Sequence, residues 1–319
     1  MTIAYTLINI SYLPVAKTLA DSFMYHNPDI PFYLCLFDDK NDIQDPIFLD
    51  YNIYDKNNLN KQEFDDMRGR YDNFSMACAL KPFFAEALIR DFSPSEVIYI
   101  DADTMLFQPM TDLQQLLQQE SLSIVLTGHQ YKIIENENEL HNNLNIRKYG
   151  LYNAGFLAFK NDEKGIMFLN WWKRILFTKC IKDPENGIYY DQTWLDLVPI
   201  YFGDHCHILK HLGYNVAYWN LEERKVSVTN NEYIINEDIP LVFYHFARFQ
   251  YYNNIYIDGF KIKFDHFPEI KVIFDDYKDK LKDNLYEKYI PFSKPKVITL
   301  REKIKTSLKF RLPLLIDKL

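Results

Sequence analysis

Two carboxylates separated by one residue, Asp101 and Asp103, stand directly after a short apolar run. Residues 97–100 are apolar and rich in β-branched side chains, which predicts a buried strand that ends just before Asp101. Ligands of open parallel sheets bind beyond the carboxyl ends of the strands. Mg²⁺ and Mn²⁺ prefer oxygen ligands and usually take one or two carboxylates together with substrate phosphates. The pair therefore favours a divalent-metal site that bridges to a diphosphate. A turn or helix-capping role for Asp103 is the alternative.

The surrounding residues predict the strands and helices that must position this pair. Residues 4–10 and 32–37 are short apolar runs, and apolar side chains recur at helical spacing between residues 13 and 23. This strand–helix–strand unit implies a parallel sheet with right-handed crossovers. The same criteria predict further strands at residues 47–54, 97–100, 124–126 and 152–159. They predict helices at residues 75–90, kinked at Pro82, and at residues 166–177.

Beyond residue 180 the periodicity is weaker, and the charge changes sign near the end. A short helix is predicted at residues 188–197, and strands at residues 216–219 and 241–246. From Pro291 to Leu319, eight Lys/Arg stand against two acidic residues, so this tail carries +6 and the rest of the chain −14. Residues 297–308 predict a basic amphipathic helix. One hypothesis is peripheral contact with anionic lipid, at about 1 kcal/mol per cation; the alternative is a solvated helix packed on the main domain.

Composition limits the classes of function. The 319 residues, 48% hydrophobic and 16% aromatic, suffice for one large core with at most a smaller appended subdomain. A net charge of −8 argues against general nucleic-acid binding, which needs a basic face. The four cysteines are widely spaced, which favours reduced thiols. Neither a signal peptide nor a spanning apolar segment is apparent, so we expect a cytoplasmic protein.

Several sequence blocks occur in the order found in one family of enzymes. The blocks cover roughly residues 1–250 and are Asn9–Ala16, Ser22, His26–Pro28, Phe37–Asp39, Ala79–Pro82, Val97–Asp103, Tyr152–Phe156, Tyr190–Gln192 and Tyr244–Phe246. Together they resemble the GT-A glycosyltransferases, and are most similar to the bacterial relatives of glycosyltransferase family eight, which build surface polysaccharide and lipopolysaccharide.

This resemblance implies both a fold and a reaction. The fold is α/β: a Rossmann-like GT-A domain at residues 1–260, with a mixed, mainly parallel sheet flanked by helices. Residues 261–319 form a C-terminal extension with the basic tail. The reaction moves a hexose or N-acetylhexosamine from a nucleotide-diphosphate sugar, expected to be a UDP-sugar, to a saccharide or lipid-linked acceptor. It uses Mn²⁺ or Mg²⁺ and retains the anomeric configuration.

The resemblance also assigns candidate residues around the metal. Asp101 and Asp103 match the family's DxD motif with Ala102 between them at the donor, and His245 matches the histidine that completes the metal site. Without the resemblance, His245 is equally a hydrogen-bonded core histidine. Lys81 matches a basic residue that faces the donor sugar or diphosphate, where a fixed cation stabilises the leaving group; a solvated helix lysine is the alternative.

Further candidates follow from two short matches. Asn153 and Gly155 match a segment of the family that lies under the donor sugar, where glycine lets backbone approach a ligand and an amide can bind a hydroxyl. Asp191 and Gln192 match an acid–amide pair that grips hydroxyls. Without the family, these residues suit a strand start and a helix cap.

The match is weaker at the diphosphate and at the nucleotide. After its histidine the family commonly has a glycine and then a lysine that holds the diphosphate, whereas this chain has Arg248 at a different spacing. Arg248 can grip phosphate in a bidentate manner. Tyr5 or Tyr12 is expected to stack on the base, and Asp38 or Asp39 to accept hydrogen bonds from the base or ribose.

Other classes of protein stay open at this point. A sugar nucleotidyltransferase usually has a glycine-rich loop after its first strand, but residues 9–14 contain no glycine. A glycosidase needs two carboxylates roughly 5 to 10 Å apart, which a sequence does not measure. A non-catalytic carbohydrate-binding or interaction protein suits the 24 Tyr and 24 Phe but leaves the ordered blocks unexplained.

Overall fold

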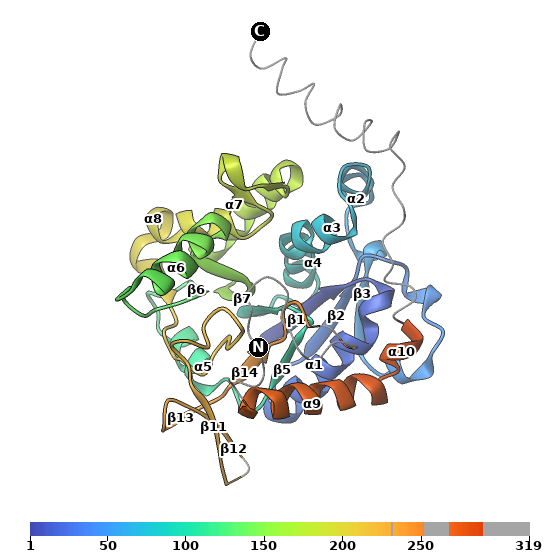
Figure 1. Cartoon of the computed structure of the whole chain (residues 1–319). Coiled ribbons are helices and arrows are strands. Elements are labelled where there is room, and N and C mark those ends of the chain that lie inside the picture. Colours follow the sequence, from blue (N-terminus) through green and yellow to red (C-terminus); the bar gives the residue numbers. More distant parts are fainter. Residues whose placement is uncertain (231, 250, 252–267, 290–319) are drawn as a thin grey trace.

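A seven-stranded sheet, in the order β10-β6-β7-β4-β1-β2-β3, forms the centre of the molecule (Figure 1). The computed structural model describes residues 1–230, 232–249, 251 and 268–289. The strands are β1 (Thr2–Ile8), β2 (Phe32–Leu36), β3 (Asn52–Asp55), β4 (Glu96–Ile100), β6 (Ile124–Gly128), β7 (Tyr152–Lys160) and β10 (Cys206–Ile208). Neighbouring strands are parallel, except that β7 runs antiparallel to both β4 and β6. The predicted mixed, mainly parallel α/β sheet is confirmed.

Each face of the sheet carries its own hydrophobic core. Along β1, Ala4 and Ile8 point into one core and Ile3, Tyr5 and Leu7 into the other, as the period of two in a strand requires. The first core holds α1 (Leu13–His26), α5 (Thr111–Leu117), α9 (Pro268–Asp283) and the two-stranded sheet of β5 (Thr104–Leu106) and β14 (Phe243–His245). The second holds α3 (Asn73–Ala79), α4 (Lys81–Phe92), α7 (Glu163–Lys179) and α8 (Val198–Phe202).

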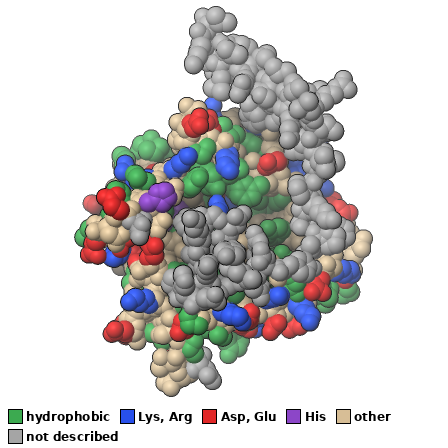
Figure 2. Space-filling model, in the orientation of Figure 1, with side chains coloured by type: hydrophobic (Ala, Val, Ile, Leu, Met, Phe, Trp, Pro, Cys, Tyr) green, Lys and Arg blue, Asp and Glu red, His purple; other side chains and the backbone are tan. Residues whose placement is uncertain are grey.

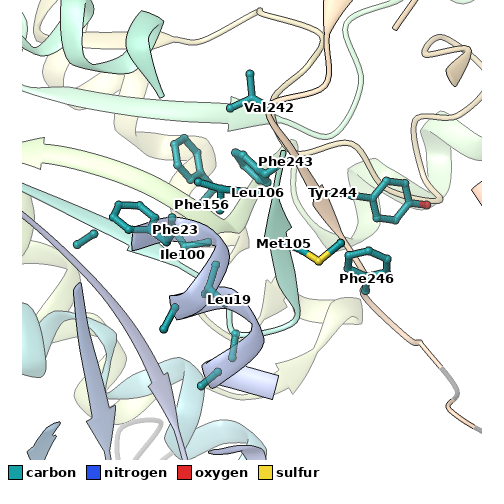
Figure 3. Close-up of a cluster of buried hydrophobic side chains, with 14 of the residues drawn as sticks. Leu19, Phe23, Ile100, Met105, Leu106, Phe156, Val242, Phe243, Tyr244 and Phe246 are labelled. Carbon is teal, nitrogen blue, oxygen red and sulfur yellow. The ribbon is translucent and has the colours of Figure 1, made fainter. Parts of the chain in front are cut away.

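The small β5–β14 sheet is anchored in the first core. Figure 3 shows Leu19 and Phe23 of α1 on the side of the cluster nearest Ile100, with Phe156, Leu106 and Phe243 grouped beside them. Because both faces of the main sheet are covered, its strands are continuous apolar runs. The ends of β4 and β14 are therefore held in position, and so are the side chains located there.

The remaining elements lie at the margins. They are α2 (Lys61–Arg68), α6 (Glu137–Tyr149), α10 (Tyr286–Tyr289), the hairpin of β8 (Lys182–Asp183) with β9 (Ile188–Tyr189), and a small sheet of β11 (Val226–Thr229), β12 (Glu232–Ile235) and β13 (Ile239–Pro240). The β11–β12 hairpin projects from the bottom of the molecule in Figure 1. On the face of the molecule that Figure 2 shows, positive and negative side chains of the described residues are mixed.

The predicted kink at Pro82 is a complete break between α3 and α4. Asp72 is the N-cap of α3. Its side chain accepts a hydrogen bond from the Ser75 N–H at 2.7 Å. Pro82 then occupies the first turn of α4, where its missing N–H has no helical partner to lose. Leu80 joins the two helices, so Lys81 is the first residue of α4.

Three other local predictions need correction. Residues 188–197 do not form one helix, because Ile188–Tyr189 pairs with Lys182–Asp183 as a strand before a 3-10 turn at Thr193–Leu197. Residues 216–219 are not a strand; only Val216 makes an isolated bridge, to Tyr244. The strand predicted at residues 47–54 begins only at Asn52, after a 3-10 turn at Pro46–Phe48.

The C-terminal predictions have different outcomes. The basic helix expected at residues 297–308 lies outside the described residues, and the division at residue 260 stays a prediction. Within the described part, Ile273 and Tyr277 of α9 belong to the same core as α1. All four cysteines are free thiols. Among the described helices, none has both the length and the apolar character needed to cross a bilayer.

Candidate metal and donor site

Three side chains from separate elements converge beyond the end of β4. Asp101 follows β4, Asp103 precedes β5 and His245 ends β14, so the β5–β14 pairing brings the histidine back beside the carboxylates. Backbone bonds fix the junction: the Asp101 N–H donates to the Gly155 carbonyl at 2.7 Å, and the Phe246 N–H to the Asp103 carbonyl at 2.7 Å. One ligand atom from each of the three side chains lies within 4.8 Å of the other two.

The charges of this triad suit a cation. Nε2 of His245 lies 3.2 Å from Asp103 Oδ1 and 3.9 Å from Asp101 Oδ2. Burial acts to raise the pKa of Asp103, but His245 outweighs it and the pKa falls below its ordinary value. Burial acts to lower the pKa of His245, but Asp103 and Asp101 together outweigh it and the pKa rises. Two carboxylates thus draw positive charge to this point, whether as a proton on His245 or as a divalent ion.

The backbone under the triad leaves no room for a side chain. A Cβ on Gly155 would lie 2.6 Å from Asp101 Oδ2, 2.6 Å from His245 Cε1 and 2.7 Å from Asn153 Oδ1. No ordinary Cβ contact is this short, so glycine is required for the three groups to approach one another. Two carboxylates and one imidazole nitrogen form a donor set that fits Mn²⁺ or Mg²⁺.

A buried amide orients the histidine. Nδ1 of His245 lies 3.1 Å from Oδ1 of Asn215, which only accepts hydrogen bonds. The proton of the neutral imidazole is therefore held on Nδ1, and Nε2 presents a lone pair towards the carboxylates. Metal-binding histidines are usually held this way by a partner on the second ring nitrogen. Asn215 is fully buried and was not singled out from the sequence.

Lys81 lies beneath the triad as a buried cation. Its Nζ is 2.8 Å from Asp191 Oδ2 and 3.2 Å from Asp101 Oδ1, and it donates to the Ala154 carbonyl at 2.9 Å. Burial acts to lower the pKa of Lys81, but the two carboxylates raise it above its ordinary value. The alternative of a solvated lysine is excluded, because Lys81 is only 3% exposed. The ammonium holds Asp101 and Asp191 together.

Asp191 and Gln192, the predicted acid–amide pair, lie in different environments. Burial raises the pKa of Asp191, with Lys81 opposing the shift. Gln192 accepts from the Asn153 side chain and from the Ala154 N–H, both at 3.2 Å, and donates to the Tyr149 carbonyl at 3.0 Å. Gln192 therefore fastens the segment that carries Gly155.

The nucleotide candidates are placed at the edge between β1 and β2. Tyr5 is fully buried and its hydroxyl donates to the Lys81 carbonyl at 2.8 Å, whereas the ring of Tyr12 is 47% exposed. Burial of its hydroxyl, followed by the charge of Asp103, raises the pKa of Tyr12 to about 12. Asp38 accepts from the Ile10 N–H at 2.8 Å, and Asp39 lies 3.5 Å from Lys56 Nζ.

The two remaining candidates border the triad. Ala102, between the carboxylates, is buried. Arg248 follows β14 with a left-handed φ of 63°, and its guanidinium lies over the ring of Tyr218 at 5.8 Å. Burial raises the pKa of Tyr189, and the charge of Arg248 opposes that shift.

Sequence reasoning missed Tyr99 and His129 as well as Asn215. The Tyr99 hydroxyl donates to Asp101 Oδ1 at 2.5 Å, from inside a strand that the pattern described only as apolar. His129 follows directly after β6 and receives the Asn153 amide at 3.3 Å. The rule that selected Asp101, a polar residue just beyond a strand's carboxyl end, also selects His129.

Comparison with known proteins gives related sequences and folds. The model of glycosyl transferase family 8 matches residues 3–245. Two uncharacterized proteins of Bacillus subtilis (strain 168) are each 28% identical to the chain: YfnF over 78% of this chain and 82% of its own length, and YfnD over 53% and 52%. Among solved structures, the glycosyltransferase GlyE of Streptococcus pneumoniae TIGR4 is 15% identical over 88% of this chain and 63% of its own, with a TM-score of 0.49.

A second solved structure matches a similar share of this chain. The galactosyltransferase LgtC, in complex with donor and acceptor sugar analogues, is 16% identical over 85% of this chain and 95% of its own, with a TM-score of 0.47. The chain's own mixed, mainly parallel sheet with helices on both faces is the GT-A architecture that the sequence blocks predicted. Because the family match includes every element that contributes to the triad, the chain belongs to glycosyl transferase family 8 and is a glycosyltransferase.

Proposed function

We propose that the chain transfers a hexose or N-acetylhexosamine from a UDP-sugar to a saccharide or lipid-linked acceptor, with a divalent metal and with retention of configuration. One observation carries the metal requirement: Asp101, Asp103 and His245 meet above a glycine that no larger residue can replace without a clash. When bound, Mn²⁺ or Mg²⁺ would stabilise the negative charge of the departing diphosphate. The three side chains would hold that ion.

The residues around the triad would orient the donor. Lys81 lies between Asp101 and Asp191, at 3.2 Å and 2.8 Å, and offsets their negative charge next to the bound donor. Arg248, placed just after β14, would offer a bidentate grip on phosphate oxygens. Tyr12 would contact the nucleotide, because its ring is exposed while that of Tyr5 is buried.

Retention is supported by the family and by the surroundings of Asp191. A general base that activates an acceptor hydroxyl must have a free carboxylate oxygen facing that hydroxyl. Asp191 is buried and ion-paired with Lys81 at 2.8 Å. This pairing favours a role in binding and charge stabilisation over proton abstraction.

A donor screen tests the proposal. UDP-, GDP-, CMP- and TDP-sugars would be offered with and without Mn²⁺ to the wild type, Asp103→Ala, and Asp204→Ala as a control at an exposed acid. We expect metal-dependent binding or slow donor hydrolysis, lost only in Asp103→Ala. Nucleotide-sugar formation from a sugar phosphate would instead identify a nucleotidyltransferase. Saccharide binding without any nucleotide signal would identify a carbohydrate-binding protein.

Membrane contact and a cytoplasmic location stay predictions from the sequence. The basic tail at residues 291–319 lies outside the described residues, so its eight cations support the idea by composition alone. Co-sedimentation with anionic liposomes, compared between the full chain and a chain ending at residue 290, measures the contribution. Equal sedimentation of the two would exclude the tail as a membrane anchor.

A further inference from the structure

Asn215 lies at the centre of a hydrogen-bonded network behind the candidate metal site. Its side-chain oxygen accepts from His245 Nδ1 at 3.1 Å. Its side-chain nitrogen donates to Asn153 Oδ1 at 3.1 Å and to the hydroxyl of Thr127 at 3.0 Å. One amide therefore links the histidine of the triad to the strand segment beneath it.

The fold places this amide with little freedom. The Val216 N–H donates to the Phe243 carbonyl at 3.2 Å, and the His245 N–H to the Val216 carbonyl at 2.8 Å, so the residue that follows Asn215 is fastened to β14 on both of its backbone groups. Asn215 has a left-handed φ of 55°, which Asn tolerates better than most residues. Its own carbonyl accepts from the Asn220 side chain at 3.0 Å. The amide is thus held from both the backbone and the side chain.

Asn153, at the other end of the network, has no hydrogen-bonding capacity left for a sugar. An Asn side chain offers two N–H donors and two acceptor lone pairs. Its oxygen accepts from Asn215 and from the Gly155 N–H at 3.0 Å, and its nitrogen donates to Gln192 and to His129 Nε2. Burial lowers the pKa of His129 to about 4, so at neutral pH its Nε2 is an acceptor while Nδ1 donates to the Leu151 carbonyl.

From these contacts we propose that Asn215 is the positioning residue of the metal site. It keeps the proton of His245 on Nδ1, so that Nε2 faces the metal, and it holds Asn153 as a strut beneath Gly155 instead of as a sugar-binding group. This inference rests on the proposed metal-dependent function. Outer partners of metal-binding histidines typically contribute 10- to 100-fold to metal affinity.

Two variants of Asn215 separate this role from general packing. Asn215→Gly tolerates the left-handed φ but removes the amide, and Asn215→Asp keeps an oxygen for His245 while losing the N–H that holds Asn153. Asn236→Gly is the matched control: Asn236 also has a left-handed φ, of 49°, and both ends of its amide are hydrogen-bonded, to the Lys225 N–H and the Glu223 carbonyl, in the β11–β12 region.

The measurement is the Kd for Mn²⁺, by calorimetry or by loss of the free-ion paramagnetic resonance signal, with thermal unfolding as the stability readout. We expect Asn215→Gly to raise this Kd at least about 10-fold, while Asn215→Asp and Asn236→Gly stay near the wild type. Wild-type affinity in a folded Asn215→Gly would overturn the inference and leave the proposed function intact. If Asn215→Gly does not fold, a large loss of affinity in Asn215→Asp would overturn it. Absence of Mn²⁺ and Mg²⁺ binding by the wild type with UDP present would overturn both.

Discussion

Lys81 and Asp191 form an ion pair that is almost completely shielded from water, with Nζ 2.8 Å from Oδ2 and side chains 4% and 5% exposed. The same ammonium reaches Asp101 at 3.2 Å, so one cation balances a carboxylate of the triad and one beside it. A buried charge that loses its partner is strongly destabilising. This pair therefore connects the stability of the domain to the geometry of its site.

Replacement of Lys81 tests that connection. Lys81→Met leaves Asp191 buried without a counter-charge, and we expect the free energy of unfolding to fall by about 3 kcal/mol or more. Lys61→Met removes an exposed pair with Asp65 and should change it by less than about 0.5 kcal/mol. Urea denaturation at neutral pH measures both. Equal effects would contradict a structural role for the buried pair.

The lack of space around Gly155 leads us to expect that replacing this glycine weakens metal binding and activity. Gly155→Ala places a Cβ 2.6 Å from Asp101 and His245, so the ligands must separate and we expect Mn²⁺ binding and transfer to weaken at least about 10-fold. Gly187→Ala is a suitable control, because its Cβ meets nothing within 4 Å although φ is +77°. That control should lose about 1 kcal/mol of stability and keep its activity. A fully active Gly155→Ala would refute the steric argument.

The burial of His129 leads us to expect that the folded protein becomes less stable as the pH falls. Its pKa is about 4 in the folded chain because it is buried, against an ordinary value near 6.5, so the unfolded chain binds more protons between these values. Stability should therefore fall as the pH drops from about 6.5 to about 4, by roughly 3 kcal/mol from this residue. His129→Gln, which retains an acceptor for Asn153, should flatten that part of the profile. Urea unfolding at pH 7, 6 and 5 compares the two proteins, with His141→Gln as the exposed control; parallel profiles would refute the assignment.

Replacing Arg248 should weaken donor binding to an extent that depends on the charge and shape of the new side chain. If its guanidinium grips phosphate, Arg248→Ala loses charged hydrogen bonds worth about 1.5–3 kcal/mol, and the KM for the donor should rise roughly 10- to 100-fold. Arg248→Lys should recover only part of this, because an ammonium lacks the planar fork. Steady-state kinetics over a range of salt, with exposed Lys225→Ala as control, makes the measurement. An unchanged KM would assign the diphosphate to another cation.

Much of the fold was predictable because local patterns report local geometry. The apolar runs of β1, β2, β4, β6 and β7 and the helical spacing of α1 and α7 appear directly in the sequence. Predictions were wrong at short elements such as Ile188–Tyr189, where pairing with Lys182–Asp183 outweighs a weak helical signal. The strands of the small sheets have two to four residues, too few to show a period.

The candidate site divides in the same way. Asp101 and Asp103 are visible in the sequence, because two oxygen ligands beside one buried strand form a local pattern with a chemical meaning. Their convergence with His245 depends on the antiparallel pairing of β5 with β14, across more than a hundred residues. Only the tertiary structure shows that Lys81 is buried between two carboxylates, that Asn153 is saturated, and that Asn215 holds His245. These are contacts between segments far apart in the chain, and they arise from packing and hydrogen-bond satisfaction, which no periodicity records.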